Sequence, residues 1–112
     1  MLLKNFENLH VADGEIVSYH SEKDKCIVVI KDWREKKITV TFTGVYTVQD
    51  MGAINEDLSH CKVSDDDPFM KESEKALGEK LKNVHCFTFW SAWRDAPNLK
   101  ILAERFKIQE RD

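Results

Sequence analysis

The sequence predicts an α+β fold, in which an antiparallel sheet of five or six strands carries one main helix. Three strand-like segments come early in the chain, at residues 15–20, 25–32 and 37–43, and only short polar links join them. Parallel neighbours would need crossover connections of about a dozen residues or more, so these strands are expected to form an antiparallel meander. Farther along the chain, Asp67-Pro68 is typical of a helix start and supplies the helical part of the fold.

The segment 37–43 has the clearest strand pattern in the chain. Ile38, Val40 and Phe42 alternate there with lysine and threonine. Because successive side chains of a strand point to opposite faces, one face of this strand is expected to join the core and the other to carry threonines into solvent. The run 26–30 is apolar throughout, which predicts a central strand covered on both faces.

The second half of the chain is predicted to hold the main helix and further strands. Residues 68–82 are expected to be helical, because apolar residues recur there at helical spacing. A short strand is expected at 58–63. Residues 84–90 are apolar at nearly every position, which predicts a second central strand and places Trp90 in the core.

Two stretches leave alternatives open. Residues 1–9 are compatible with a short helix or with an irregular lead-in. Residues 98–109 favour a strand, in which a bulge near 103–105 would bring two apolar sets of opposite parity to one face. A helix is the competing interpretation for this second stretch.

Composition limits the classes of protein to which the chain can belong. Its 112 residues are the usual length of one domain, so 1–112 is interpreted as a single domain. Hydrophobic residues make up 42% of the chain and the net charge is only −3, a combination that excludes intrinsic disorder. The balanced charge gives no general footprint for nucleic acid, and no apolar run approaches the ~20 residues that span a bilayer. We therefore expect neither nucleic acid nor membrane as a partner.

The three cysteines indicate the compartment. Cys26, Cys61 and Cys86 are an odd number and form no C-x-x-C unit, so they are interpreted as free structural thiols in a reducing cytosol. The start of the chain also lacks the continuous apolar stretch of a secretory signal. Both observations predict a cytoplasmic protein.

The histidines offer no recognisable metal site or catalytic motif. His60-Cys61 and His85-Cys86 are adjacent pairs, and adjacent side chains on a strand point to opposite faces. Structural zinc needs four ligands, normally in close pairs, and the chain lacks that spacing as well as a nucleophile elbow or a phosphate loop. We therefore expect no metal, no cofactor and no enzyme activity.

Tryptophan and arginine residues form the first candidate binding surface. Trp33 is expected in a turn, and Trp93 and Arg94 in a loop that follows a strand. These residue types are the most enriched in binding hot spots, and a turn tryptophan is hard to explain by core packing alone. We interpret these three side chains as candidate contacts with a partner protein.

An acidic stretch forms the second candidate surface. Residues 56–67 carry five acidic side chains against one lysine, whereas residues 31–37 carry four bases against two acids. The candidate contacts in the acidic stretch are Glu56, Asp57, Asp65 and Asp66. Opposite charge raises association rates and selects partners, so a basic partner protein would suit this stretch. The alternative interpretation is a solvated loop without a partner.

Several short segments together resemble a known class of bacterial proteins. They are HVADGEI at 10–16, VTFTGV at 40–45, INEDL at 54–58, CFTF at 86–89 and LKILAERFKI at 99–108. In this order they resemble the small immunity proteins of polymorphic toxin systems and related families of unknown function. The resemblance implies a compact α+β or mostly β domain that has no enzyme site and binds a cognate toxin.

Three hypotheses for the function follow. The preferred one is a non-catalytic protein-binding module, such as an immunity or toxin-antagonist protein. The alternative is a small enzyme or ligand-binding domain in which His10, Asp13 and His60 meet in a cleft. The second alternative is a structural homodimer that pairs exposed sheet edges.

Overall fold

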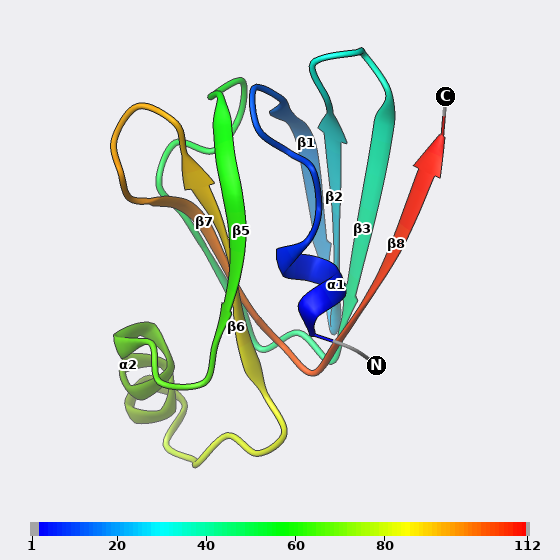
Figure 1. Ribbon diagram of the computed structural model, residues 1–112. Helices are drawn as coiled ribbons and strands as arrows, with labels where there is room; N and C mark the ends of the chain where they lie inside the picture. The colour runs from blue at the N-terminus through cyan, green and yellow to red at the C-terminus, as the bar shows by residue number, and fades with distance from the viewer. Residues whose placement is uncertain (1–2, 112) are drawn as a thin grey trace.

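Within residues 3–111, which the computed structural model describes, eight strands form two antiparallel sheets that pack face to face (Figure 1). The first sheet has the order β1-β2-β3-β8, with the bounds β1 Glu15–Glu22, β2 Lys25–Lys31, β3 Lys37–Thr43 and β8 Arg105–Arg111. The second sheet has the order β4-β7-β6-β5, with the bounds β4 Thr47–Asp50, β7 Pro97–Ala103, β6 His85–Ser91 and β5 Leu58–Ser64. The helices are α1 Lys4–Glu7 and α2 Pro68–Leu77.

The fold is broadly α+β, but its strand content differs from the prediction. A sheet of five or six strands with one main helix is wrong, because residues 3–111 form eight strands in two sheets and two short helices. The predicted meander is confirmed, since β1 pairs with β2 and β2 with β3, both antiparallel. Periodicity assigns each strand a buried face without naming what covers it, and here a second sheet covers it. Residues 1, 2 and 112 of the predicted single domain lie outside the described residues.

The stretch 98–109 is extended, so the helix alternative is wrong, but the predicted single strand with a bulge is wrong as well. It forms β7 and β8, interrupted only at Glu104, where the chain passes from the second sheet to the first. The Glu104 N–H donates to the carbonyl oxygens of Thr43 and Gly44, at 3.2 and 3.1 Å. Gly44 has a φ of 67°, and a Cβ there would collide with the Glu104 side chain, so this crossing requires glycine.

The core lies between the two sheets. Its fully buried side chains from the sheets include Val28, Ile30, Val40, Phe42, Phe87, Phe89, Leu99 and Ile101. As predicted, β2 and β6 are inner strands of their sheets. The prediction that 26–30 is covered on both faces is wrong, because Ile27 and Val29 lie half-buried on the outer face of the first sheet. The prediction of a core position for Trp90 is wrong as well: it is half-buried and stacks on His60.

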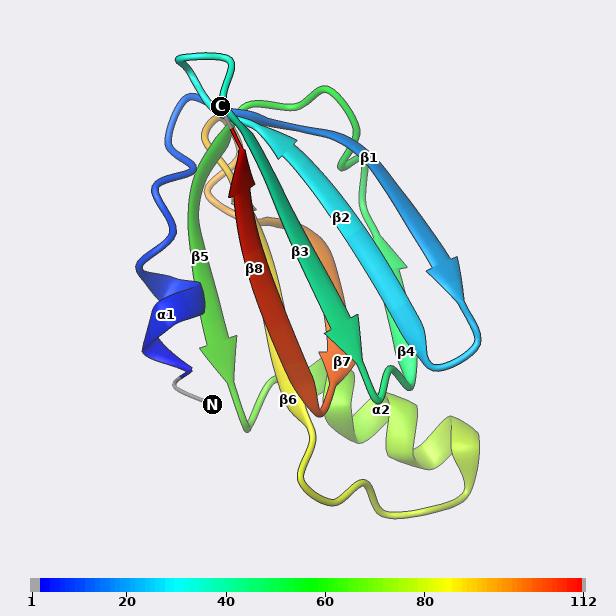
Figure 2. The ribbon, with the colours of Figure 1, turned by 90° about the vertical axis from the view of Figure 1, so that its right-hand side faces the viewer.

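The helix α1 closes one open side of the sandwich. It packs against β5, and Figure 2 shows it on the side of the sandwich where β5 and β8 are the edge strands. Phe6 projects from it into the core and makes edge-on contacts with Phe42, Phe87 and Phe89, at ring-centroid distances of 5.9, 5.1 and 5.3 Å. The described part of the ambiguous lead-in is therefore a short helix, and it supplies an aromatic side chain to both sheets.

The helix α2 begins as predicted but ends earlier. Oδ1 of Asp67 accepts a hydrogen bond from the Phe69 N–H at 2.9 Å, which caps the helix. Gly78 adopts a left-handed φ of 73° and ends the helix there, so the predicted end at residue 82 is wrong. The helix lies over Cys86 and Leu102 at one end of the second sheet rather than across a whole face. No helix in the described part is long and apolar enough to cross a membrane.

Tyr19 and Asp50 join the two sheets on the side where β1 and β4 are the edge strands. The Tyr19 hydroxyl donates to Oδ2 of Asp50 at 2.6 Å, while Oδ1 of Asp50 accepts the N–H groups of Gly52 and Ala53. The hydrogen bond to Asp50, together with burial, raises the pKa of Tyr19 to about 12. The same hydrogen bond lowers the pKa of Asp50, against the effect of burial. The contact therefore favours a protonated phenol beside an ionised carboxylate.

We expect Tyr19 to ionise at about pH 12 in the folded protein. The chain has two tyrosines, so a Tyr46→Phe variant reports Tyr19 alone through its tyrosinate absorbance. The stability from this contact is fully present from above the usual Asp pKa of about 4 up to the usual Tyr pKa of about 10. It is lost as the pH rises through about 12, and as it falls through the lowered pKa of Asp50. Adding Asp50→Asn should move the absorbance midpoint toward about 10, and equal midpoints in the two proteins would contradict the assignment.

Candidate functional site

Four connecting segments lie together at one end of the sandwich, uppermost in Figure 1. They are residues 11–14 before β1, 32–36 between β2 and β3, 51–57 between β4 and β5, and 92–96 between β6 and β7. Strand register and the isolated bridges align the strand ends from which they leave, since Glu15 lies opposite both Lys31 and Asp57, and Leu58 opposite Ser91. We call this surface the loop end.

The loop 92–96 is attached to the segment before β5 by two side-chain contacts. The Trp93 indole N–H donates to Oδ2 of Asp57 at 3.0 Å. The Arg94 guanidinium donates to both carboxylate oxygens of Glu56, at 2.9 and 3.3 Å, and to the Met51 carbonyl oxygen at 2.9 Å. Four residues predicted as partner contacts therefore lie together, but Glu56, Asp57 and Arg94 hold each other and the loop. Trp93, with 77% of its surface exposed, faces outward.

Ser91 supports this loop from below. Its hydroxyl donates to Oε1 of Glu56 at 2.5 Å and accepts the N–H groups of Trp93 and Arg94, at 3.1 and 3.3 Å. The hydrogen bond from Ser91 lowers the pKa of Glu56, against the effect of burial, and the Arg94 guanidinium acts in the same direction. The carboxylate is thus kept ionised and engaged inside the protein rather than offered to a partner.

The turn 32–36 holds the second exposed tryptophan. Oδ1 of the buried Asp32 accepts the N–H groups of Arg34 and Lys36, at 2.9 and 2.8 Å. Burial by itself would raise the pKa of Asp32, but these hydrogen bonds keep it below its usual value. The Arg34 guanidinium lies 5.5 Å from the centroid of the Trp33 ring, within cation–π distance. Trp33 is 69% exposed on this well-defined turn.

Gly14 connects the two tryptophan-bearing segments. A Cβ at Gly14 would lie 2.7 Å from the Lys31 carbonyl oxygen and 3.0 Å from the Asp32 Cα. The backbone at Gly14 therefore packs directly against the backbone at the start of the turn 32–36. On its other side, the Gly14 carbonyl accepts the Leu58 N–H at 2.8 Å. Leu58 directly follows Asp57, which holds Trp93. Trp33 and Trp93 therefore belong to one continuous, hydrogen-bonded end of the molecule.

The structure does not bring the acidic stretch 56–67 together as one patch. The strand β5, of seven residues, separates Asp57 from Asp65 and Asp66, and at about 3.3 Å per residue this puts them roughly 25 Å apart. At the far end, Oδ1 of Asp65 lies 2.5 Å from Nδ1 of His85, and the Ser64 hydroxyl donates to Asp66. Each half of the stretch has its own local hydrogen bonds.

The three residues of the alternative cleft come from two neighbouring segments, since the Asp13 N–H donates to the Leu58 carbonyl oxygen at 3.0 Å and His60 follows Leu58 on β5. The His60 ring stacks on Trp90 with centroids 5.2 Å apart, and Lys62 Nζ lies 4.7 Å from the same indole. His10 is exposed in the segment before β1, and Asp13 is exposed in the turn after it. Within residues 3–111, no hydrogen bond or ion pair joins any two of His10, Asp13 and His60.

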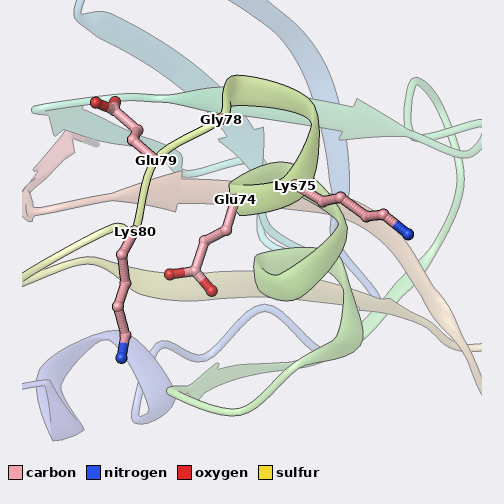
Figure 3. Close-up of a pocket in the computed structure, with 5 residues that line it drawn as sticks. All are labelled: Glu74, Lys75, Gly78, Glu79 and Lys80. Atoms are coloured by element: carbon pink, nitrogen blue, oxygen red, sulfur yellow. The ribbon is translucent and has the colours of Figure 1, made fainter.

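Other reactive groups show no convergent arrangement. The three cysteines are free and buried, and burial raises the pKa of Cys26 to about 11 and of Cys86 to about 12, and that of Cys61 as well. A depression at the end of α2 is lined by Glu74, Lys75 and Lys80, among others, but Figure 3 shows these side chains pointing in different directions. The described residues contain no cluster of three or more His, Cys, Asp or Glu that could hold a metal ion.

The sequence did not identify the residues that hold the loop end in place, which are Asp32, Gly14 and Ser91. Asp32 and Gly14 had local signals, because Asp commonly bonds the backbone two residues ahead and Asp-Gly marks a turn. Ser91 had none, since its carboxylate partner lies 35 positions away. Comparison of the chain with protein-family models, with curated proteins and with solved structures found no match. Its function is therefore inferred from the fold and from the loop end.

Proposed function

We propose that this protein is a non-catalytic protein-binding module whose contact surface is the loop end. The single observation that carries the proposal is the exposure of two tryptophans, Trp33 and Trp93, on connecting segments at the same end of the sandwich. Each indole presents a large apolar area, and tryptophan is the residue most typical of binding hot spots.

The support beneath the two tryptophans favours binding over a purely structural role. Asp32 organises the turn of Trp33, while Glu56, Asp57 and Ser91 hold the loop of Trp93. A contact surface fixed before association loses less conformational entropy on binding. Arg34 and Arg94 lie beside the two indoles, and each is paired with a carboxylate, Asp32 and Glu56 respectively. The partner that this surface and the resemblance together suggest is a toxin domain, which makes the chain a toxin antagonist.

Combining Trp33→Ala with Trp93→Ala is expected to weaken binding by at least about thirtyfold, because a hot-spot truncation costs ~2 kcal/mol or more. The partner to use is the protein encoded by the neighbouring gene, co-expressed with this chain and titrated calorimetrically after purification. Both side chains are mostly exposed, so the variant should keep its thermal midpoint within a few degrees.

The matched control removes two exposed apolar side chains elsewhere, Tyr46→Ala with Leu77→Ala, which are 40% and 49% exposed. Unchanged affinity in the control and loss in the tryptophan variant support the loop end. Equal affinity in both variants would reject it, and absence of any complex would reject the toxin-antagonist assignment. Sedimentation of the isolated chain tests the homodimer: a dimer that the tryptophan substitutions dissociate would make the partner a second copy.

A further inference from the structure

The outer face of the first sheet is a regular array of side chains. Figure 2 shows the strands β1, β2, β3 and β8 facing the viewer with no helix in front of them. Strand register aligns their outward side chains in rows. From the loop end downward the rows are Glu15-Lys31-Lys37-Arg111, Ser18-Val29-Thr39-Gln109, His20-Ile27-Thr41-Lys107 and Glu22-Lys25-Thr43-Arg105. We call these residues the outer array.

Positive charge dominates the outer array. Its cations are Lys25, Lys31, Lys37, Arg105, Lys107 and Arg111, all exposed, and its only acids are Glu15 and Glu22. Lys31 lies 4.0 Å from Glu35, and Arg105 lies 3.9 Å from Glu104. The other four cations form no ion pair within 4 Å with another residue of 3–111. A chain with a net charge of −3 therefore carries six cations against two acids on one face.

The centre of the outer array is apolar rather than charged. The two middle rows contain Ile27 and Val29 beside two threonines, all half-buried. A bulge in β1 leaves Val17 43% exposed next to them. A hollow of about 320 Å³ opens beside Val29, between β1, β2 and the turn 32–36. Val17 and Val29 are among its lining residues, together with Lys31, Lys37 and the single acid Glu35.

We propose that the outer array is a docking surface for an acidic protein, which places an apolar side chain in the hollow and carboxylates on the basic rows. An apolar centre with a polar, charged rim is the usual anatomy of a protein–protein interface. Opposite charge on the two partners steers association and selects the partner. The surface contains neither Trp33 nor Trp93, so the tryptophan substitutions that test the loop end leave this proposal to its own experiment.

The composition of the outer array favours a protein over a nucleic acid. A single strand needs aromatic side chains on which bases stack, and the array has no tryptophan, tyrosine or phenylalanine. A phosphate backbone lying across the face would meet Ile27, Val29 and threonines at the centre instead of cations. A protein surface with an apolar residue among aspartates and glutamates matches the outer array in both respects. Its apolar residue contacts the apolar centre, and its carboxylates contact the basic side chains of the rows.

The test uses a short synthetic peptide in which valine and isoleucine are flanked by glutamate and aspartate. Titrated into the 15N-labelled protein at low salt, it is expected to shift the backbone amides of β2, β3 and β8. Combining Arg105→Glu, Lys107→Glu and Arg111→Glu should weaken binding at least about tenfold, since each exposed ion pair contributes a modest amount and three are reversed. Raising the ionic strength from about 0.05 to about 0.3 M should also weaken binding, because salt screens exposed charges.

The matched control reverses the same number of charges on and just beyond α2, with Lys71→Glu, Lys75→Glu and Lys80→Glu. Binding retained in this control and lost in the β8 variant supports the proposal. Equal loss in both would show a general charge effect and overturn it, as would amide shifts confined to other elements or no binding at all. Oligo(dT) and a mixed-sequence DNA duplex are titrated in parallel, and binding of either one without binding of the peptide overturns the assignment to a protein.

Discussion

Replacing Phe6 with alanine is expected to lower the free energy of unfolding by about 3–5 kcal/mol, the usual cost of truncating a buried phenylalanine. The Phe6 ring is fully buried and touches aromatic rings from both sheets. Its removal leaves a cavity at the centre of the core, because the rings around it are held by separate strands that cannot collapse together. The edge-on contacts with the neighbouring aromatic rings, which stabilise the fold beyond the burial of apolar surface, are lost at the same time.

The position of Phe6 on α1 adds to this effect. The helix α1 has four residues, far fewer than the ~12–15 that an isolated helix needs to be even marginally stable in water. It is held on the sandwich by Phe6, by the flanking Leu3 and Leu9, which pack against the core, and by the bond from the Val63 N–H to Glu7. Without the ring, the side between β5 and β8 should open.

Denaturant unfolding measures the change, with Phe69→Ala as the matched control. Phe69 is a half-buried phenylalanine of α2 that packs against the smaller apolar cluster. Its truncation should cost clearly less, because less of its surface is removed from water. A cost for Phe6→Ala no larger than that for Phe69→Ala would show that α1 does not close the core. Hydrogen exchange of the β5 amides provides a second readout, expected to quicken in Phe6→Ala alone.

Replacing Gly14 with alanine is expected to cost about 1–3 kcal/mol, the usual penalty for forcing extra atoms into a packed site. The added Cβ would lie 2.7 Å from the Lys31 carbonyl oxygen and 3.0 Å from both the Asp32 Cα and the Val11 carbonyl oxygen. All three neighbours are backbone atoms, so none can move aside by changing a rotamer. The segment at Gly14 must then move away from the turn that holds Trp33, which also disturbs the hydrogen bond from the Leu58 N–H to the Gly14 carbonyl.

The control for this substitution is Gly78→Ala. A Cβ at Gly78 meets nothing within 4 Å, but its φ of 73° strains any side chain by about 1 kcal/mol. Both variants thus carry a methyl group in place of hydrogen, and only Gly14→Ala should disturb the loop end. Amide shifts in the segments 32–36 and 56–58 of Gly14→Ala would show this. A change confined to residue 14, or stability equal to that of the wild type, would contradict the role of Gly14 as the link.

The sequence predicted local structure well where the signal is local. The alternation in 37–43 assigned the buried face of β3, and Asp67-Pro68 marked the start of α2. The helix ends at Leu77, five residues before the predicted end, because Gly78 adopts a left-handed conformation that ends a helix even where apolar residues at helical spacing follow. The change of parity near residue 104 was interpreted as a bulge within one strand, whereas the structure has two strands there, β7 and β8, in different sheets.

The remaining features of the fold and of the loop end depend on contacts between residues that are far apart in the sequence. By itself the sequence determined the buried face of β3, the early meander, the helix start and the presence of tryptophans in loops. Only the tertiary structure decided that two sheets share the core, that Phe6 joins them, and that six cations align on one face. It also turned Glu56 and Asp57 inward onto Arg94 and Trp93. The physical reason is that periodicity records which side of a strand is buried, whereas strand pairing and charge contacts depend on residues tens of positions away.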